Sequence, residues 1–227
     1  MMKNIGKQIR TAFIVASLFC SFQLFAQDKL TQQQKWDLKV ANYLKQDSIN
    51  PPGKNVILFT GSSSIENWKT LKEDFPTKNV LNRGISGTQT TNFMQYIDKV
   101  VTPYKAKQIF LYEGDNDIGF KKTPQEILQT FTVLFNAIRK DNKQAEIIYM
   151  SIKPSPRRLK DSSNIEQTNL LIKDFLKDKK NTAYADMYYP LLTADKKLMP
   201  EYYREDGLHL TAAGYKVWAD AIRPFIK

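Results

Sequence analysis

The sequence of 227 residues contains only one cysteine, Cys20, and only one histidine, His209. A single thiol cannot form an intramolecular disulfide, and one thiol with one imidazole excludes metal centres that need several such ligands. Nine glycines and ten prolines are too few and too dispersed for a low-complexity chain, and no repeat of about 20 to 50 residues recurs. With 42% hydrophobic and 25% charged residues, the composition is that of an ordinary globular protein.

Residues 1–26 have the pattern of a secretory signal peptide. Three basic residues come before an apolar run that covers 11–26. We expect cleavage after Ala26, which leaves 27–227 as a single domain in the periplasm or outside the cell. An uncleaved N-terminal anchor is the alternative, although this run is short for a bilayer span, and no later run approaches that length.

The chain is basic, with a formal net charge of +11. Loss of the three basic residues in 1–26, which has no acidic residue, reduces this charge to +8. The lysines are spread along the chain instead of forming one arm, and no nucleic-acid-binding motif is present. We therefore expect no nucleic-acid partner, while attraction of acidic substrates remains an alternative role for the charge.

Five short runs rich in β-branched and aromatic residues are bounded by polar or turn residues. Two of them contain continuous apolar stretches, 56–59 and 109–112, as expected for parallel strands that are covered on both faces. The predicted strands are Asn55–Gly61, Asn79–Gly84, Lys107–Gly114, Glu146–Lys153 and Thr182–Tyr188.

Segments with helical periodicity lie between these runs. The clearest begins at Thr123, followed by Pro124 at the first helical position and Glu126 as the partner in a capping box. Its apolar residues from Ile127 to Ile138 recur at helical spacing. Further predicted helices are Gln33–Leu44, Ile65–Leu71, Thr90–Val100, Ser163–Leu176 and Thr211–Ile222. The alternation predicts an α/β fold, a three-layer α/β/α sandwich around a central five-stranded parallel sheet.

A serine and the only histidine are the candidate catalytic pair. The first predicted strand ends in Gly61-Ser62-Ser63-Ser64, and a serine at such a turn faces outward beside the N–H groups of the next helix. His209 follows Asp206 by three residues, so the carboxylate can bind the imidazole and fix its tautomer. Each feature alone is also explained by helix capping.

Two further predicted strands end in residues that can donate hydrogen bonds to an oxyanion. Asn116 follows the third strand, and its side-chain NH₂ is a donor. Gly87 lies in the turn after the second strand, where a glycine can bring its backbone N–H close to the same point.

Four segments of the sequence contain, in chain order, Ser63, Gly87, Asn116 and the Asp206–His209 pair. Together these segments resemble the conserved blocks of the SGNH hydrolases, also called GDSL-like lipases or acylhydrolases. The segments Gly61–Ile65 and Gly114–Asp117 resemble the versions found in bacterial members similar to platelet-activating factor acetylhydrolase subunits, and the resemblance spans nearly all of 27–227. It implies a flavodoxin-like fold, Ser63 as nucleophile, Asp206 and His209 as its partners, and an oxyanion hole formed by Ser63, Gly87 and Asn116. Ser62 stands where the family usually has aspartate. The resemblance implies no metal and no cofactor.

The expected activity is hydrolysis of a short-chain acyl ester, such as an acetyl ester on a carbohydrate, because no extended apolar lid segment is visible. Partners would be a small-molecule or glycan ester, with no nucleic acid and no membrane insertion of the cleaved chain. The alternatives are a lysophospholipase or thioesterase, an acetyltransferase, and a glycan-binding member of the fold without turnover.

Several neighbouring residues have alternative interpretations. Ser64 is adjacent to the candidate nucleophile, and motif register favours Ser63. The carboxylates that flank Asn116 at 115 and 117 are predicted to cap a loop, with a bound cation as the alternative. Glu113 is predicted to orient a loop. The arginines at 157–158 follow the fourth strand, where they would either contact an anionic substrate or remain exposed.

Overall fold

The computed structural model describes residues 29–227. The chain divides into two units, Met1–Lys35 and Trp36–Lys227. In the described part of the first unit, reciprocal hydrogen bonds between Thr31 and Gln34 cap the start of a helix. The expected boundary after Ala26 lies outside the described residues. Between 29 and 227, no helix has both the length and the apolarity needed to cross a bilayer.

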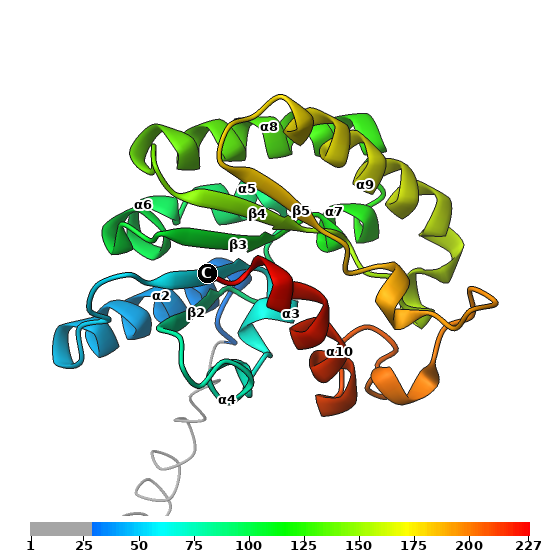
Figure 1. The fold of residues 1–227 in the computed structure, drawn as a ribbon, viewed down its shortest axis with the longest axis horizontal. Helices are drawn as coiled ribbons and strands as arrows, with labels where there is room; N and C mark the ends of the chain where they lie inside the picture. The colour runs from blue at the N-terminus through cyan, green and yellow to red at the C-terminus, as the bar shows by residue number, and fades with distance from the viewer. Residues whose placement is uncertain (1–28) are drawn as a thin grey trace, which may run out of the picture. The chain divides into compact units, whose positions relative to one another are not determined.

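The second unit contains a sheet of five parallel strands, which confirms the predicted fold class (Figure 1). Their order across the sheet is β2-β1-β3-β4-β5, the order of a flavodoxin-like doubly wound sheet. The strands are β1 (Ile57–Gly61), β2 (Val80–Gly84), β3 (Gln108–Tyr112), β4 (Glu146–Met150) and β5 (Thr182–Ala185).

Helices cover both faces of this sheet because successive side chains of each strand point to opposite faces. In β1, Leu58 packs into the cluster formed with α2, α5, α6, α8 and α9, whereas Ile57 and Phe59 pack into the cluster formed with α3, α4 and α10. The helices are α2 (Gln32–Ile49), α3 (Ser63–Glu66), α4 (Leu71–Asp74), α5 (Thr90–Met94), α6 (Ile97–Val100), α7 (Asp115–Gly119), α8 (Pro124–Asp141), α9 (Ser162–Lys177) and α10 (Ala212–Ile222).

Two predicted helices are each divided in the structure, so those two predictions were wrong in detail. In place of Ile65–Leu71 there are α3 and α4, and the side-chain amide of Asn82 donates to the carbonyl oxygen of Ile65 in α3 and to that of Trp68 between the two helices. In place of Thr90–Val100 there are α5 and α6. The break matters for the site, because α3 is then a single short turn of which Ser63 is the first residue.

Candidate active site

The candidate residues lie on segments that follow the carboxyl ends of the strands. Ser63 begins α3 directly after β1, Gly87 lies in the loop after β2, and Asn116 lies in α7 after β3. Asp206 and His209 come from the loop before α10. In parallel sheets these carboxyl ends share one edge, where doubly wound folds bind their ligands.

The turn between β1 and α3 determines which serine faces the histidine. Gly61 has a φ of +127°, and a Cβ at this position would overlap the Tyr112 carbonyl group, so only glycine fits. Ser64 is buried, and its carbonyl oxygen accepts from the Tyr215 hydroxyl at 2.8 Å. The hydroxyl of Ser63 instead lies 2.9 Å from Nε2 of His209. The geometry thus agrees with the register that favours Ser63 over Ser64.

Ser63, His209 and Asp206 form one chain of hydrogen bonds. Nδ1 of His209 lies 2.6 Å from Oδ2 of Asp206, and Oδ1 of Asp206 accepts the backbone N–H groups of Leu208 and His209 at 2.9 Å. Because the carboxylate only accepts, Nδ1 carries the proton and Nε2 is left to accept from Ser63. The arrangement can therefore move a proton from the serine hydroxyl to the imidazole.

The environment of Asp206 keeps its carboxyl group ionised. Burial acts to raise the pKa of Asp206, but the hydrogen bonds from the His209 side chain and from the two backbone N–H groups outweigh burial and lower it well below the usual range. The anion is therefore present at neutral pH, beside Nδ1 of His209.

Asn116 and Gly87 are joined through Thr88. Nδ2 of Asn116 donates to the Thr88 carbonyl oxygen at 2.8 Å, which fixes the side-chain amide against the loop after β2. The Ile85 N–H donates to the Gly61 carbonyl oxygen at 2.7 Å, which holds the same loop against the end of β1. Gly87 has a φ of +81°, a conformation that favours glycine.

A buried acid supports this loop from below. Oγ1 of Thr88 lies 2.9 Å from both the Ile85 carbonyl oxygen and Oε1 of Glu113. Burial, together with the negative charge of Asp117, raises the pKa of Glu113 well above its usual value. The Thr88 hydroxyl donates to Oε1 of Glu113 and also lies within hydrogen-bond distance of the Ile85 carbonyl oxygen. Glu113 thus hydrogen-bonds to the loop that carries Gly87.

The acidic residues that flank Asn116 are neutralised by protein cations. Asp115 binds Nζ of Lys153 at 2.7 Å and Nε of Arg158 at 3.1 Å, and Asp117 binds Nζ of Lys122 at 2.6 Å. Within residues 29–227 no group of three or more His, Cys, Asp or Glu side chains is arranged to hold a metal ion. These contacts explain both carboxylates as structural groups of the α7 segment.

The two arginines after β4 differ in environment. Arg158 is turned inward onto Asp115, and its guanidinium packs against Gly119, so the interpretation of an exposed loop arginine is wrong for this residue. Arg157 is exposed, and its backbone N–H donates to the Gly207 carbonyl oxygen at 2.9 Å. The segment therefore braces both α7 and the loop that carries Asp206.

Replacement of Lys153 by methionine tests this brace. Burial acts to raise the pKa of Asp115, but Lys153 and Arg158 lower it, so the carboxylate is charged inside the protein. We expect Lys153→Met to reduce the free energy of unfolding by about 3 kcal/mol, because removal of one partner leaves a poorly compensated buried charge. Thermal unfolding should show a Tm lower by about 6 to 12 °C.

The effect of Lys153→Met should also depend on pH. Because the folded-state pKa of Asp115 is lowered, its stabilisation is present above the ordinary carboxyl pKa and is lost as the pH falls through the folded-state value. The difference in Tm between variant and wild type should therefore shrink in acid. The double variant Lys153→Met/Asp115→Asn, which removes the charge, should recover part of the lost stability; a double variant less stable than Lys153→Met would contradict this account.

Several residues of the site carry no local sequence signal. Lys153 is a fully buried lysine, Thr88 and Glu113 form an internal contact, and Glu66 and Trp36 both bond the backbone of Ser86. Their partners lie between 20 and 50 residues away in the sequence. Only the docking of the elements brings these pairs together.

Comparison with known proteins identifies the family of the chain and finds structures with the same fold. The family model for GDSL-like lipase/acylhydrolase matches residues 50–217, a span that includes every candidate site residue. None of the curated proteins matches this sequence.

Solved structures resemble the chain at low sequence identity. A Streptococcus pneumonia protein, provisionally described as a platelet activating factor, has 22% identity and a TM-score of 0.75, with coverage of 96% of this chain and 98% of its own. A GDSL-like lipase of Bacteroides thetaiotaomicron has 22% identity and a TM-score of 0.70, with coverage of 82% and 96%. The acetylxylan esterase Axe2 of Geobacillus stearothermophilus, in a catalytic mutant, has 18% identity and a TM-score of 0.62, with coverage of 75% and 94%. By its family match, the chain belongs to the GDSL-like lipases and acylhydrolases and is a carboxylic ester hydrolase.

Proposed function

We propose that the protein is an exported serine esterase that removes a short acyl group, such as acetyl, from a carbohydrate ester. The observation that carries this proposal is the chain of hydrogen bonds from Ser63 through His209 to Asp206, with distances of 2.9 and 2.6 Å. A base within hydrogen-bond reach of a hydroxyl, itself oriented by a third group, is the arrangement that activates a serine.

The proposed reaction has two steps. Nε2 of His209 takes the proton of Ser63 as Oγ attacks the ester carbonyl carbon, and the imidazolium then gives that proton to the leaving alkoxide. The alcohol departs and an acyl group remains on Ser63. In the second step His209 takes a proton from water, the hydroxide attacks the acyl carbon, and Ser63 regains a proton as the carboxylic acid leaves.

Three donors are proposed to stabilise the oxyanion: the backbone N–H groups of Ser63 and Gly87 and the side chain of Asn116. The amide of Asn116 has two N–H bonds, and its contact with the Thr88 carbonyl oxygen uses one of them. The second N–H can then bind the substrate oxygen, and the bond of the first N–H to Thr88 fixes the orientation of the amide group.

Asn116→Ala should lower kcat by about 100- to 1000-fold and change KM little, because the lost donor acts mainly in the transition state. Steady-state kinetics on p-nitrophenyl acetate measure both constants. A folded Asn116→Ala variant with wild-type kcat would remove Asn116 from the oxyanion hole.

The choice of a short acyl group rests on two observations. The sequence has no extended apolar lid segment to receive a long chain, and one of the structures with this fold is an acetylxylan esterase. A series of p-nitrophenyl esters of increasing chain length tests the proposal, with kcat/KM expected to be highest for acetate. Higher values for long acyl chains or for thioesters would favour the lysophospholipase or thioesterase alternative, and transfer of acetyl to an added sugar would favour an acetyltransferase.

A fluorophosphonate probe tests the proposed nucleophile without knowledge of the natural substrate. We expect one adduct, located on Ser63 by peptide mapping, and no adduct in His209→Ala. The variant Ser64→Ala is the matched control and should label like the wild type. No adduct on a folded wild-type protein would favour a glycan-binding protein without turnover.

The proposal of export to the periplasm or to the medium rests on the basic and apolar pattern of residues 1–26. The intact mass of the protein recovered from cells tests it. We expect the mass of a chain that begins at Gln27. The mass of a chain that still contains residues 1–26 would indicate an uncleaved anchor.

A further inference from the structure

The two peptide groups on either side of Ser86 are both held by side chains from other elements. The Ser86 N–H donates to Oε2 of Glu66 in α3 at 2.7 Å. The Ser86 carbonyl oxygen accepts from Nε1 of Trp36 in α2 at 2.8 Å. Backbone groups in an exposed loop are ordinarily satisfied by water, so two dedicated side-chain partners at one residue call for an explanation.

The contact of Trp36 bears directly on Gly87. The Ser86 carbonyl and the Gly87 N–H belong to the same planar trans peptide group, in which the C=O and N–H bonds point in opposite directions. An indole that holds the carbonyl oxygen on one side therefore aims the Gly87 N–H toward the other. Gly87 is exposed, and among residues 29–227 no protein group accepts a hydrogen bond from its N–H. This N–H is thus free to bind a ligand, and its direction is fixed from behind.

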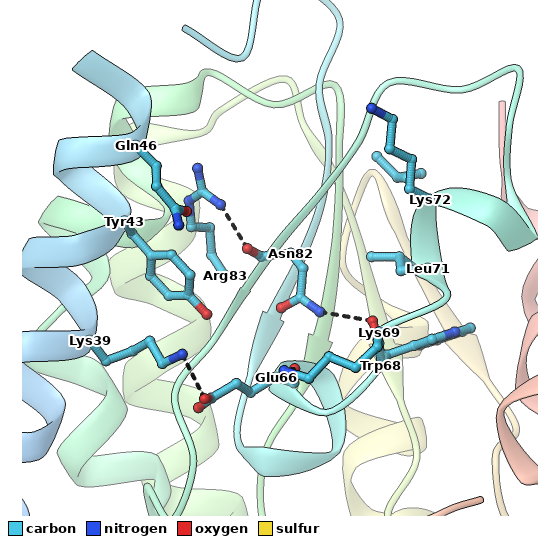
Figure 2. Close-up of a pocket in the computed structure, with 11 residues that line it drawn as sticks. Lys39, Tyr43, Gln46, Glu66, Trp68, Lys69, Leu71, Lys72, Asn82 and Arg83 are labelled. Carbon is cyan, nitrogen blue, oxygen red and sulfur yellow. Dashed lines mark hydrogen bonds and ion pairs between the residues drawn. The ribbon is translucent and has the colours of Figure 1, made fainter. Parts of the chain in front are cut away.

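Glu66 links the same loop to the helix that begins with Ser63. Its second oxygen, Oε1, pairs with Nζ of Lys39 at 2.7 Å, as Figure 2 shows. Burial acts to raise the pKa of Glu66, but the hydrogen bonds from Lys39 and Ser86 lower it, so the acceptor is an anion. Lys39 and Trp36 are three residues apart on α2 and so project from the same face of that helix. One face of α2 therefore supports both contacts with the loop.

We propose that Trp36 and Glu66 are positioning residues that aim the Gly87 N–H at the oxyanion, and that α2 is thereby part of the catalytic apparatus although it contributes no group that touches the substrate. This proposal rests on the proposed serine esterase function. A donor that must lie within a few tenths of an ångström of the developing charge loses most of its effect when its peptide group can rotate.

The test uses Trp36→Phe in the full chain, which deletes the indole donor and keeps an aromatic ring. With p-nitrophenyl acetate we expect kcat to fall about 10- to 100-fold with KM within about twofold of wild type. Tyr43→Phe is the matched control. Tyr43 is also a buried aromatic residue of α2, and its hydroxyl donates to the Gly84 carbonyl oxygen at 2.7 Å, but that peptide group does not contain the Gly87 N–H. Tyr43→Phe should therefore retain wild-type kcat.

A pair of substitutions at Glu66 provides an independent measurement. Glu66→Gln keeps an oxygen that can accept from the Ser86 N–H, while its ion pair with Lys39, at the edge of a cavity of about 330 Å³, is lost. Glu66→Ala removes the acceptor. We expect Glu66→Ala to lower kcat in the same way as Trp36→Phe and Glu66→Gln to restore most of it.

The outcomes separate this proposal from the function on which it rests. If fluorophosphonate labels Ser63 in wild type, but Trp36→Phe has wild-type kcat or falls no further than Tyr43→Phe, the positioning role is wrong and the esterase function stands. If wild type does not label at Ser63, the function fails and the positioning role fails with it. Labelling of wild type, a fall in kcat confined to Trp36→Phe and Glu66→Ala, and unchanged KM would establish the role.

Discussion

His209→Ala should lower kcat by about 10⁶-fold, the largest effect expected of any single substitution in this protein. The chain contains only this histidine, so no second imidazole can take over as base. The remaining activity should still exceed the reaction in water by about 10³- to 10⁴-fold, because the proposed oxyanion donors and the substrate-binding surface are unchanged. Steady-state kinetics with p-nitrophenyl acetate, on protein purified free of host esterases, measure this fall.

The fold should survive this substitution. The side chain of His209 is partly exposed, and its two polar contacts are those with Ser63 and Asp206. Its backbone N–H, which donates to Asp206, is retained in alanine. We therefore expect a thermal transition close to that of wild type, which separates loss of chemistry from loss of structure.

A double variant gives a sharper test of the pair. If Ser63 and His209 act as a unit, Ser63→Ala/His209→Ala should be no slower than either single variant, because the second substitution removes nothing that still functions. Additive losses would show that the two residues contribute separately, which would contradict the proposed proton transfer between them.

The sheet could be predicted from the sequence because its signal is local. Continuous apolar runs such as 109–112 occur where a strand is covered on both faces, and all five predicted runs form parallel strands. The ends of the strands were predicted less well. The strand predicted at Glu146–Lys153 ends earlier in the structure, because β4 stops at Met150. Met150 forms the last pair with β5, opposite Ala185. Strand length is set by the neighbour, which a local pattern does not reveal.

Among the residues of the candidate site, too, those with a local sequence signal could be predicted and those that depend on packing could not. Ser63, Asn116 and the Asp206–His209 pair could be located because each follows a recognisable strand or precedes a recognisable helix. Trp36 could not, because nothing near residue 36 indicates that its indole meets the Ser86 carbonyl oxygen. Polar side chains that bond a distant backbone group can be identified only when the packing of the elements is known.

The buried charged residues near the site are a second group of residues that could not be identified from the sequence. A lysine in a loop is ordinarily exposed, yet the side chain of Lys153 is fully buried because Asp115 lies within 2.7 Å of its Nζ. This pair also turns Arg158 inward and fixes the first residue of α7 beside Asn116. The exposed position that is usual for an arginine in a loop is therefore wrong for Arg158, because Asp115 draws its side chain inward.

Asp206→Asn is expected to lower kcat by about 10⁴-fold. Asparagine can still accept the backbone N–H groups of Leu208 and His209 through its oxygen, so the turn before α10 should persist. Its NH₂ group, however, would face Nδ1 of His209 and donate to it. The imidazole would then carry its proton on Nε2, the atom that must accept from Ser63, and proton transfer would be blocked.

Three measurements separate this tautomer effect from a loss of stability. Asp206→Asn should bind a slow substrate with near wild-type KM, and kcat alone should fall. The folded-state pKa of Asp206 is lowered, so the stabilisation by its charge is present above the ordinary carboxyl pKa of about 4 and is lost as the pH falls below it. Wild type should therefore be more stable than Asp206→Asn at pH 7, and the stabilities of these two proteins should converge in acid.

Asp206→Ala, which also loses the acceptor of the two backbone N–H groups, should be less stable than Asp206→Asn at every pH. If kcat of Asp206→Asn stays within tenfold of wild type, Asp206 does not set the tautomer of His209.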